Sequence, residues 1–106
     1  ASNDIGVINL REGHLIGAFE AFELILSQAP DNAEAALNRA ITLTLMGDMD
    51  DKAIWDRVME ICADLDGIDE TRALADELAK LPGKDRKDSK KAPALIARAA
   101  LAPIDI

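Results

Sequence analysis

Two glycines, Gly13 and Gly47, stand 34 residues apart in the first half of this 106-residue chain. Ala18 and Phe22 follow the first glycine, and Pro30 comes eight residues after Phe22. Glycine accepts the left-handed conformation that ends many helices, and proline interrupts a helix because it lacks an amide hydrogen. The spacing therefore predicts a repeated unit made of a helix, a tight turn, a second helix and a second turn.

The first unit resembles a tetratricopeptide repeat in the residues that pack and end its helices, namely Gly6, Gly13, Ala18, Phe22 and Pro30. The resemblance gives each residue a role. Gly6 and Ala18 let the two helices of one repeat cross closely, and Phe22 fills the space between one helix pair and the next. No activity follows from it, because the repeat motif encodes packing.

The second unit is degenerate. Its alanine comes one residue late, at Ala53, and Arg57 and Val58 stand where the aromatic residue is expected. It closes on Asp66 and Gly67 instead of a proline. The match to the family is therefore good over residues 2–66 and loose beyond them.

A third unit is indicated by Gly83, 36 residues after Gly47, with a first helix over 69–81. Together the units imply an all-α fold in which tetratricopeptide-like antiparallel helix pairs stack as a short right-handed α-solenoid. An unrelated antiparallel helix bundle is the alternative. We expect a repeat domain over 2–81, a polar basic linker over 82–91, and a C-terminal helix and tail over 92–106.

The composition agrees with an all-α fold. Aromatic residues make up 3% of the chain. Apolar residues recur at steps of three and four, as in Leu15, Phe19, Phe22 and Leu26. The predicted helices cover about 3–12, 15–29, 33–46, 51–65, 69–81 and 93–102.

Polar residues at the helix starts support these boundaries. We expect Asp31 or Asn32 to cap the third helix, and Asp50 and Asp51 to cap the fourth. On the fifth helix, Leu74, Leu78 and Leu81 should face the second repeat, whereas Arg72, Asp76, Glu77 and Lys80 should stay in water.

Charge divides the chain into an acidic body and a basic tail. Residues 1–81 carry 17 acidic and 6 basic side chains, a net charge of −11, whereas residues 82–106 carry 3 acidic and 6 basic ones, a net charge of +3. An acidic body repels phosphate backbones, so nucleic acid is not an expected partner. The basic stretch from 82 to 91 reads as a mobile, solvated linker.

Motifs for catalysis or metal binding are not found in the sequence. His14 is the only histidine and has no nucleophile in a known arrangement, and Cys62 lies on an apolar stripe as a small core residue. The acidic segment 64–70 lacks calcium-loop spacing, because its sixth position is Asp69 rather than glycine. We expect no enzyme activity, no cofactor and no metal site.

The sequence contains neither a span of about 20 apolar residues nor a leader of charged then apolar residues. We therefore expect a soluble chain that does not insert into a membrane. A single cysteine fits the cytoplasm but does not exclude the periplasm. The compartment is not predicted.

The tetratricopeptide resemblance implies a groove lined by the first helix of each repeat. Its expected lining residues are Asn3, Val7, Leu10, Arg11, Leu37, Asn38, Ile41, Thr44 and Leu45. Family members that bind chaperone tails need basic residues where this chain has Glu70 and Leu74, so that function is disfavoured. Such an apolar groove suits an amphipathic helix or an apolar peptide.

A candidate occupant lies in the same chain. Residues 92–102 begin with Ala92 and Pro93, carry Leu95, Ile96 and Ala99 on one face, and are followed by Pro103. We expect this segment to pack on the repeat body, where it caps the last repeat or fills a groove.

Two functions follow from the resemblance. The first is a non-catalytic adaptor or scaffold for a protein or peptide partner, of the kind used in bacterial envelope, secretion or pilus assembly. The second is a helical accessory module of a larger enzyme, such as a transferase, with catalysis outside this chain. A homodimer is also expected to be accessible, because short arrays expose apolar end faces.

Overall fold

The computed structural model describes residues 2–47 and 52–99 of the chain. These residues form seven helices and no strand: α1 (Ser2–Arg11), α2 (Leu15–Gln28), α3 (Ala33–Met46), α4 (Lys52–Ile61), α5 (Ile68–Ala79), α6 (Gly83–Arg86) and α7 (Ala92–Ala97). The prediction of an all-α fold is confirmed over this part of the chain.

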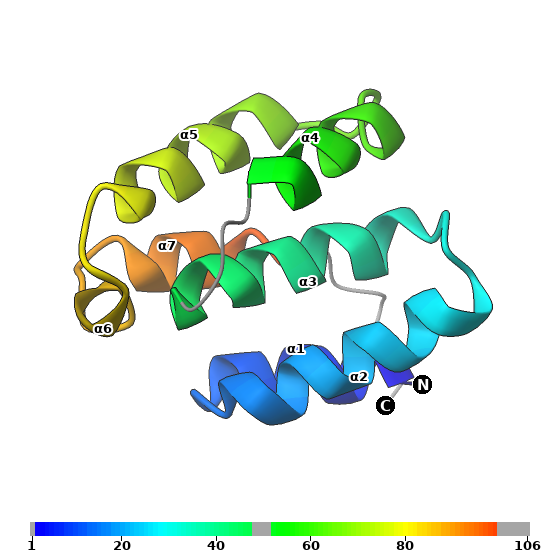
Figure 1. Ribbon diagram of the computed structural model, residues 1–106, viewed down its shortest axis with the longest axis horizontal. Coiled ribbons are helices and arrows are strands. Elements are labelled where there is room, and N and C mark those ends of the chain that lie inside the picture. Colours follow the sequence, from blue (N-terminus) through cyan, green and yellow to red (C-terminus); the bar gives the residue numbers. More distant parts are fainter. Residues whose placement is uncertain (1, 48–51, 100–106) are drawn as a thin grey trace.

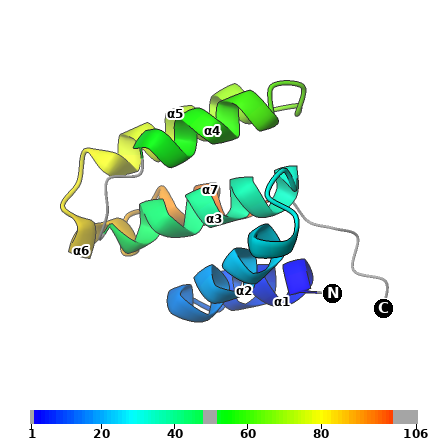
Figure 2. The same ribbon diagram turned by 45° about the vertical axis from the view of Figure 1, so that its right-hand side comes forward.

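The helices lie in three layers, with α1 and α2 in one, α3 and α7 in the second, and α4 and α5 in the third (Figure 1). The turned view keeps the same order (Figure 2). Helix α3 is the centre of the fold, because ten of its 14 residues are buried. It packs against each of the other six helices.

Helices α1 and α2 approach closely at two small residues. A Cβ atom added to Gly6 would lie 2.4 Å from Cε1 of Phe22, so the aromatic ring occupies the space that any larger residue would need. Gly17 similarly faces Asn9, whose side-chain nitrogen would lie 3.3 Å from an added Cβ. The predicted close crossing at Gly6 is confirmed, and Phe22 is fully buried.

The turn between these helices depends on Gly13, whose φ of 81° lies in the left-handed region. Helix α3 begins at the predicted cap, where the Asn32 side chain accepts a hydrogen bond of 2.9 Å from the amide of Ala35. Its end is marked by Gly47, with a φ of 68°. The predicted caps of the fourth helix, Asp50 and Asp51, lie outside the described residues.

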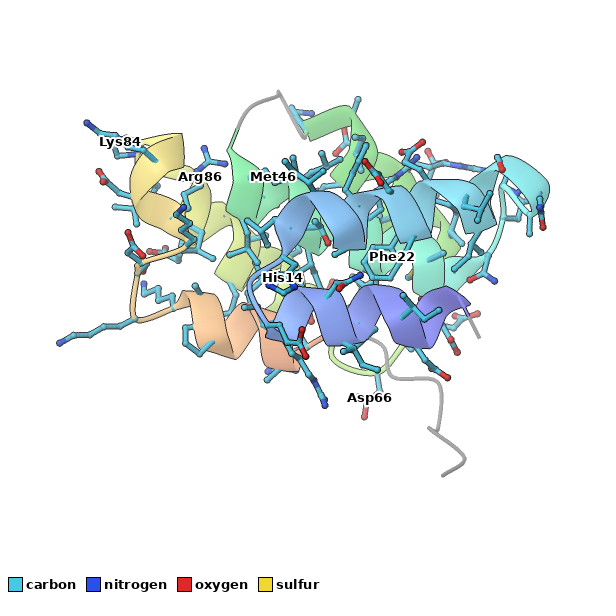
Figure 3. The ribbon with its side chains drawn as sticks, turned by 90° about the horizontal axis from the view of Figure 1, so that it is seen from below. His14, Phe22, Met46, Asp66, Lys84 and Arg86 are labelled. Carbon is cyan, nitrogen blue, oxygen red and sulfur yellow. The ribbon has the colours of Figure 1, made fainter. Side chains whose placement is uncertain are left out.

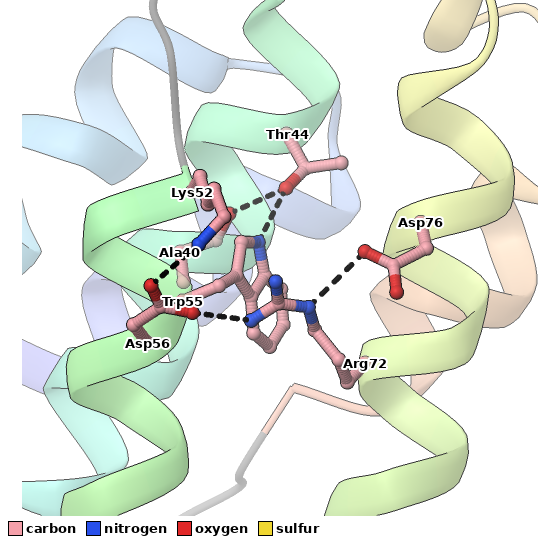
Figure 4. Close-up of polar contacts among 7 residues, drawn as sticks. All are labelled: Ala40, Thr44, Lys52, Trp55, Asp56, Arg72 and Asp76. Atoms are coloured by element: carbon pink, nitrogen blue, oxygen red, sulfur yellow. Dashed lines mark hydrogen bonds and ion pairs between the residues drawn. The ribbon is translucent and has the colours of Figure 1, made fainter.

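Helix α4 and helix α5 are held together by a polar cluster around Trp55, which is drawn in Figure 4. The indole Nε1 donates a 2.8 Å hydrogen bond to Oγ1 of Thr44, and the guanidinium of Arg72 lies 5.7 Å from the centre of the indole ring. Arg72 also contacts carboxylates on both helices, Asp76 at 3.1 Å and Asp56 at 3.7 Å. The expectation that Arg72 stays in water is wrong, because its side chain is only 22% exposed.

The buried face of α5 differs from the predicted one. Leu78 is buried as predicted, and Leu74 packs against the core while it stays partly exposed. Leu81, however, is 36% exposed, because α5 ends at Ala79. Thr71 and Ala75 complete the buried face in its place.

The segment 82–91, expected to be a loop, contains α6. The guanidinium of Arg86 donates hydrogen bonds to three backbone carbonyls, those of Thr44 at 3.1 Å, Leu81 at 3.1 Å and Ala79 at 3.3 Å. These bonds tie α6 to the ends of α3 and α5. The polar composition of the segment therefore gave no indication of α6.

Gly83 does not end a helix, as the third repeat unit required. It begins α6 and lacks the positive φ of Gly13 and Gly47. It meets Gly47 instead: a Cβ on Gly83 would lie 2.6 Å from the carbonyl oxygen of Gly47. The assignment of Gly83 as the turn glycine of a third unit is wrong, and its smallness serves a contact between backbones.

Candidate protein-binding surfaces

The structure places the nine predicted groove residues on α1 and α3. Seven of them are buried: Val7, Leu10, Leu37, Asn38, Ile41, Thr44 and Leu45. Asn3 is half-buried and Arg11 is exposed. The amide of Asn38 donates a 3.1 Å hydrogen bond to Asn3, so this polar pair links α3 to α1. Most of the predicted groove is therefore covered in this structure.

Helix α7 covers part of this groove. It packs against α3 and α5, and it buries Ala92 and Leu95 in the same core cluster as Leu37 and Ile41. Ile96 lies with Leu10 and Leu45 around a small hollow of about 230 Å³. Figure 3 shows α7 beside the end of α1 that leads to His14. The prediction that the C-terminal helix packs on the body is confirmed over the described residues.

An ion pair holds the start of α7 to α5. Nζ of Lys91 lies 3.1 Å from Oε2 of Glu77, whose other oxygen accepts a 2.9 Å hydrogen bond from Lys80. The hydrogen bonds from Lys80 and then Lys91 hold the pKa of Glu77 below its ordinary value. All three groups are exposed, so this contact orients α7 more than it stabilises the fold.

Thr44 has a structural role that the groove assignment missed. Its hydroxyl donates a 3.0 Å hydrogen bond to the carbonyl of Ala40 and accepts one from Trp55, while its own carbonyl accepts from Arg86. It thus connects α3 with α4 and α6. A threonine on an apolar helix face was the only signal in the sequence, and it does not reveal which partners meet there.

A second hollow, here called the basic hollow, opens between the α1–α2 turn, the end of α3 and α6. It measures about 500 Å³. Its apolar lining comes from Leu15, Ile16, Leu45 and Met46, and its basic side chains are His14, Lys84 and Lys87. Figure 3 shows His14, Met46 and Lys84 at the same end of the molecule.

The charge around the basic hollow is unusual for this chain, whose net charge is −8. None of its lining residues is acidic. Lys84 and Lys87 have no carboxylate partner among the described residues, whereas Lys52, Lys80 and Lys91 are each paired. His14 lies 3.5 Å from Glu12, and Asp88 lines the adjoining smaller hollow. The sequence did not reveal this site, because the polar composition of 82–91 is typical of a solvated linker.

The outer face of the first layer exposes large apolar side chains. They are Ile5 and Ile8 on α1 and Ile16 and Leu24 on α2. Exposed apolar faces of this kind are expected at the end of a short array. The homodimer that we expect from them stays a prediction.

The chemistry of the remaining side chains is limited. Cys62 is buried as predicted, its thiol lies 3.5 Å from the carbonyl of Ala33, and burial raises its pKa. In the described ranges, no group of three or more histidine, cysteine or carboxylate residues is placed to hold a metal ion. Within those same ranges, no helix has the length and apolar character needed to cross a bilayer.

No family model, curated protein or solved structure matches this chain. Over the residues that the structure describes, the chain is all-helical, most of the predicted groove residues are buried, and the basic hollow is open.

Proposed function

We propose that this chain is a non-catalytic adaptor of the tetratricopeptide type, whose groove holds an amphipathic helix of a partner protein. In this proposal α1–α2 and α3–α4 are the first two repeats of a short right-handed solenoid, and α5 begins a third. The observation that supports it most directly is the position of α7, a helix seated on the first helices α3 and α5 and beside α1.

The contacts of α7 resemble those of a helix bound in a groove. Leu95 is fully buried in the core, and Ile96 faces Leu10 and Leu45. Anchors on one face of a short helix are how grooves of this kind recognise helical ligands. Helix α7 of the chain itself thus carries the apolar anchors that the groove accepts.

The size of α7 makes exchange with a partner feasible. The helix has six residues, too few to be helical alone in water. Burial of Leu95 contributes about 1.5–3 kcal/mol, a modest amount for a ligand to replace. A longer partner helix with more apolar anchors competes favourably for the same surface.

The test compares two charge substitutions on α7. Leu95→Asp removes the buried anchor, whereas Ala94→Asp adds the same charge at an exposed position of the same helix. The probe is a fluorescent synthetic peptide of residues 90–99. We expect Leu95→Asp to bind this probe at least about tenfold more tightly than Ala94→Asp or the wild type, because its groove is vacated.

The same two variants serve as baits in affinity capture from native extract. A partner that uses the groove is retained by Leu95→Asp and displaced by the peptide. Circular dichroism and size-exclusion chromatography establish that both variants keep the helix content and the oligomeric state of the wild type, and Leu95→Ala replaces Leu95→Asp if the latter unfolds. Equal probe binding by the folded Leu95 and Ala94 variants would contradict the proposal.

A further inference from the structure

We propose that the basic hollow is a second docking site, which binds an acidic amphipathic segment of a partner protein. The segment places an apolar side chain in the hollow and its carboxylates beside Lys84 and Lys87. This site differs from the groove, because it is open while α7 is in place.

The shape of the hollow suits a side chain of a partner. Its volume of about 500 Å³ falls in the range of about 300–1,000 Å³ that is typical of ligand pockets. Leu15 and Met46 are partly buried in its wall, and Ile16 is 66% exposed at the α2 side. An apolar side chain that enters contacts three apolar residues that water otherwise covers.

The charge of the hollow selects an acidic partner. Lys84 and Lys87 stand on either side of Arg86, whose three bonds to backbone carbonyls anchor α6. The anchored arginine holds the two lysines at the rim, where the described residues supply no carboxylate for them. A carboxylate of the partner at hydrogen-bond distance from a lysine gains a charge-assisted bond that no described carboxylate of this chain makes with Lys84 or Lys87.

The overall charge argues for a short protein segment and against a nucleic acid or a membrane surface. The chain carries 20 acidic and 12 basic side chains. An extended polyanion or an anionic bilayer is repelled by the negative net charge of the whole chain. A short segment feels mainly the charges within a Debye length, about 8 Å at physiological ionic strength, and Lys84 and Lys87 line the hollow itself.

The test uses isotope-labelled full chain and two synthetic amphipathic peptides. Both have the same leucine face, and one carries glutamate where the other carries lysine on the polar face. We expect the glutamate peptide to shift the amide signals of Leu15, Ile16 and Met46, and the lysine peptide to leave them unchanged. Binding of the glutamate peptide should weaken as salt is added.

Charge reversal locates the site. The double variant Lys84→Glu and Lys87→Glu should weaken binding of the glutamate peptide at least about tenfold, as expected when two charge-assisted bonds are lost. The matched control is Lys90→Glu, an exposed lysine of the same segment that does not line the hollow, and it should bind as the wild type does. Equal affinity of the double variant and the Lys90 variant overturns the proposal.

Two more measurements distinguish this site from a membrane-binding surface and from the groove. Vesicles of phosphatidylserine and phosphatidylcholine test a membrane surface; vesicle binding without peptide binding would also overturn the proposal. Leu95→Asp opens the groove, which also accepts the leucine face of either peptide, but the amide signals of Ile16 and Met46, which line only the basic hollow, should still shift with the glutamate peptide alone. These measurements therefore distinguish a groove that does not bind a helix from a hollow that does not bind an acidic segment.

Discussion

The first and last helix pairs of this protein are held together in different ways. Between α1 and α2 the contact is made by small residues, where the ring of Phe22 fills the space left by Gly6. Between α4 and α5 the contact is made by Arg72, which lies over the Trp55 ring and beside Asp56. The two contacts span similar distances in sequence, but the first pair depends on steric fit and the last pair on cation–π and ionic contacts.

The largest effect is expected from the steric contact of the first pair. Phe22→Ala should lower the free energy of unfolding by about 3–5 kcal/mol, measured by urea denaturation, because it leaves a cavity beside Gly6. Gly6→Ala should destabilise the wild type by about 1–3 kcal/mol through overpacking. In the Phe22→Ala background, Gly6→Ala should lower the free energy of unfolding only slightly, because the ring with which it clashes is absent. Additive effects would show that the two residues are not coupled.

The junction of α3 and α6 gives the next largest effect. Gly47→Ala places a Cβ atom 2.3 Å from Cα of Gly83, whereas Gly13→Ala meets nothing within 4 Å. Both glycines have a positive φ, so each variant has a similar backbone cost. The extra clash should make Gly47→Ala more destabilising by about 1–3 kcal/mol in thermal or urea unfolding. Equal losses of stability in the two variants would mean that α6 shifts and relieves the clash at no cost.

The hydrogen bond by which Trp55 of the last pair contacts α3 should have a smaller effect. Trp55→Phe removes the hydrogen bond to Thr44 and should cost about 1–2 kcal/mol, because the hydroxyl keeps its bond to Ala40. A double-mutant cycle with Thr44→Val isolates the pair. We expect the combined loss to be smaller than the sum of the single losses; strict additivity would exclude an energetic role for this bond.

The smallest effect concerns the ion pair that orients α7. The lowered pKa of Glu77 means that its contribution is present above the ordinary carboxyl pKa and is lost as the pH falls through the lowered pKa of the folded state. Amide exchange at the start of α7 should therefore quicken in acid relative to the rest of the fold. Glu77→Gln should show the quicker exchange at neutral pH, and its exchange at the start of α7 should then follow the same pH dependence as the rest of the fold. Unchanged exchange in this variant would exclude a role for the pair.

The sequence predicted the first half of the fold more accurately than the second. Helices α2 and α3 begin at the predicted residues, Asn32 caps as expected, and Gly13 and Gly47 have positive φ. These features depend on residues within a few positions of each other. Helix α6 was missed because its stability comes from Arg86, which bonds to carbonyls on two distant helix ends.

The two candidate sites also differ in how far the sequence predicted them. The tetratricopeptide resemblance selected residues of α3 as lining a partner groove, which stays a prediction, and the expected apolar face of the C-terminal segment is buried at Leu95 and Ala99. The sequence left open whether this segment caps the last repeat or fills a groove, and it did not predict that Lys84 and Lys87 would border a hollow with Met46. Both outcomes depend on how segments far apart in sequence approach each other.

The amino-acid sequence by itself determined the all-helical class and the helix ends at Gly13 and Gly47. Glycine conformation, capping and periodic burial act over a few residues, so their consequences can be read locally. Tertiary structure alone decided that Gly83 meets Gly47, that Arg72 lies over Trp55, and that Arg86 bonds to the ends of α3 and α5. These contacts join residues that only the packed core brings together.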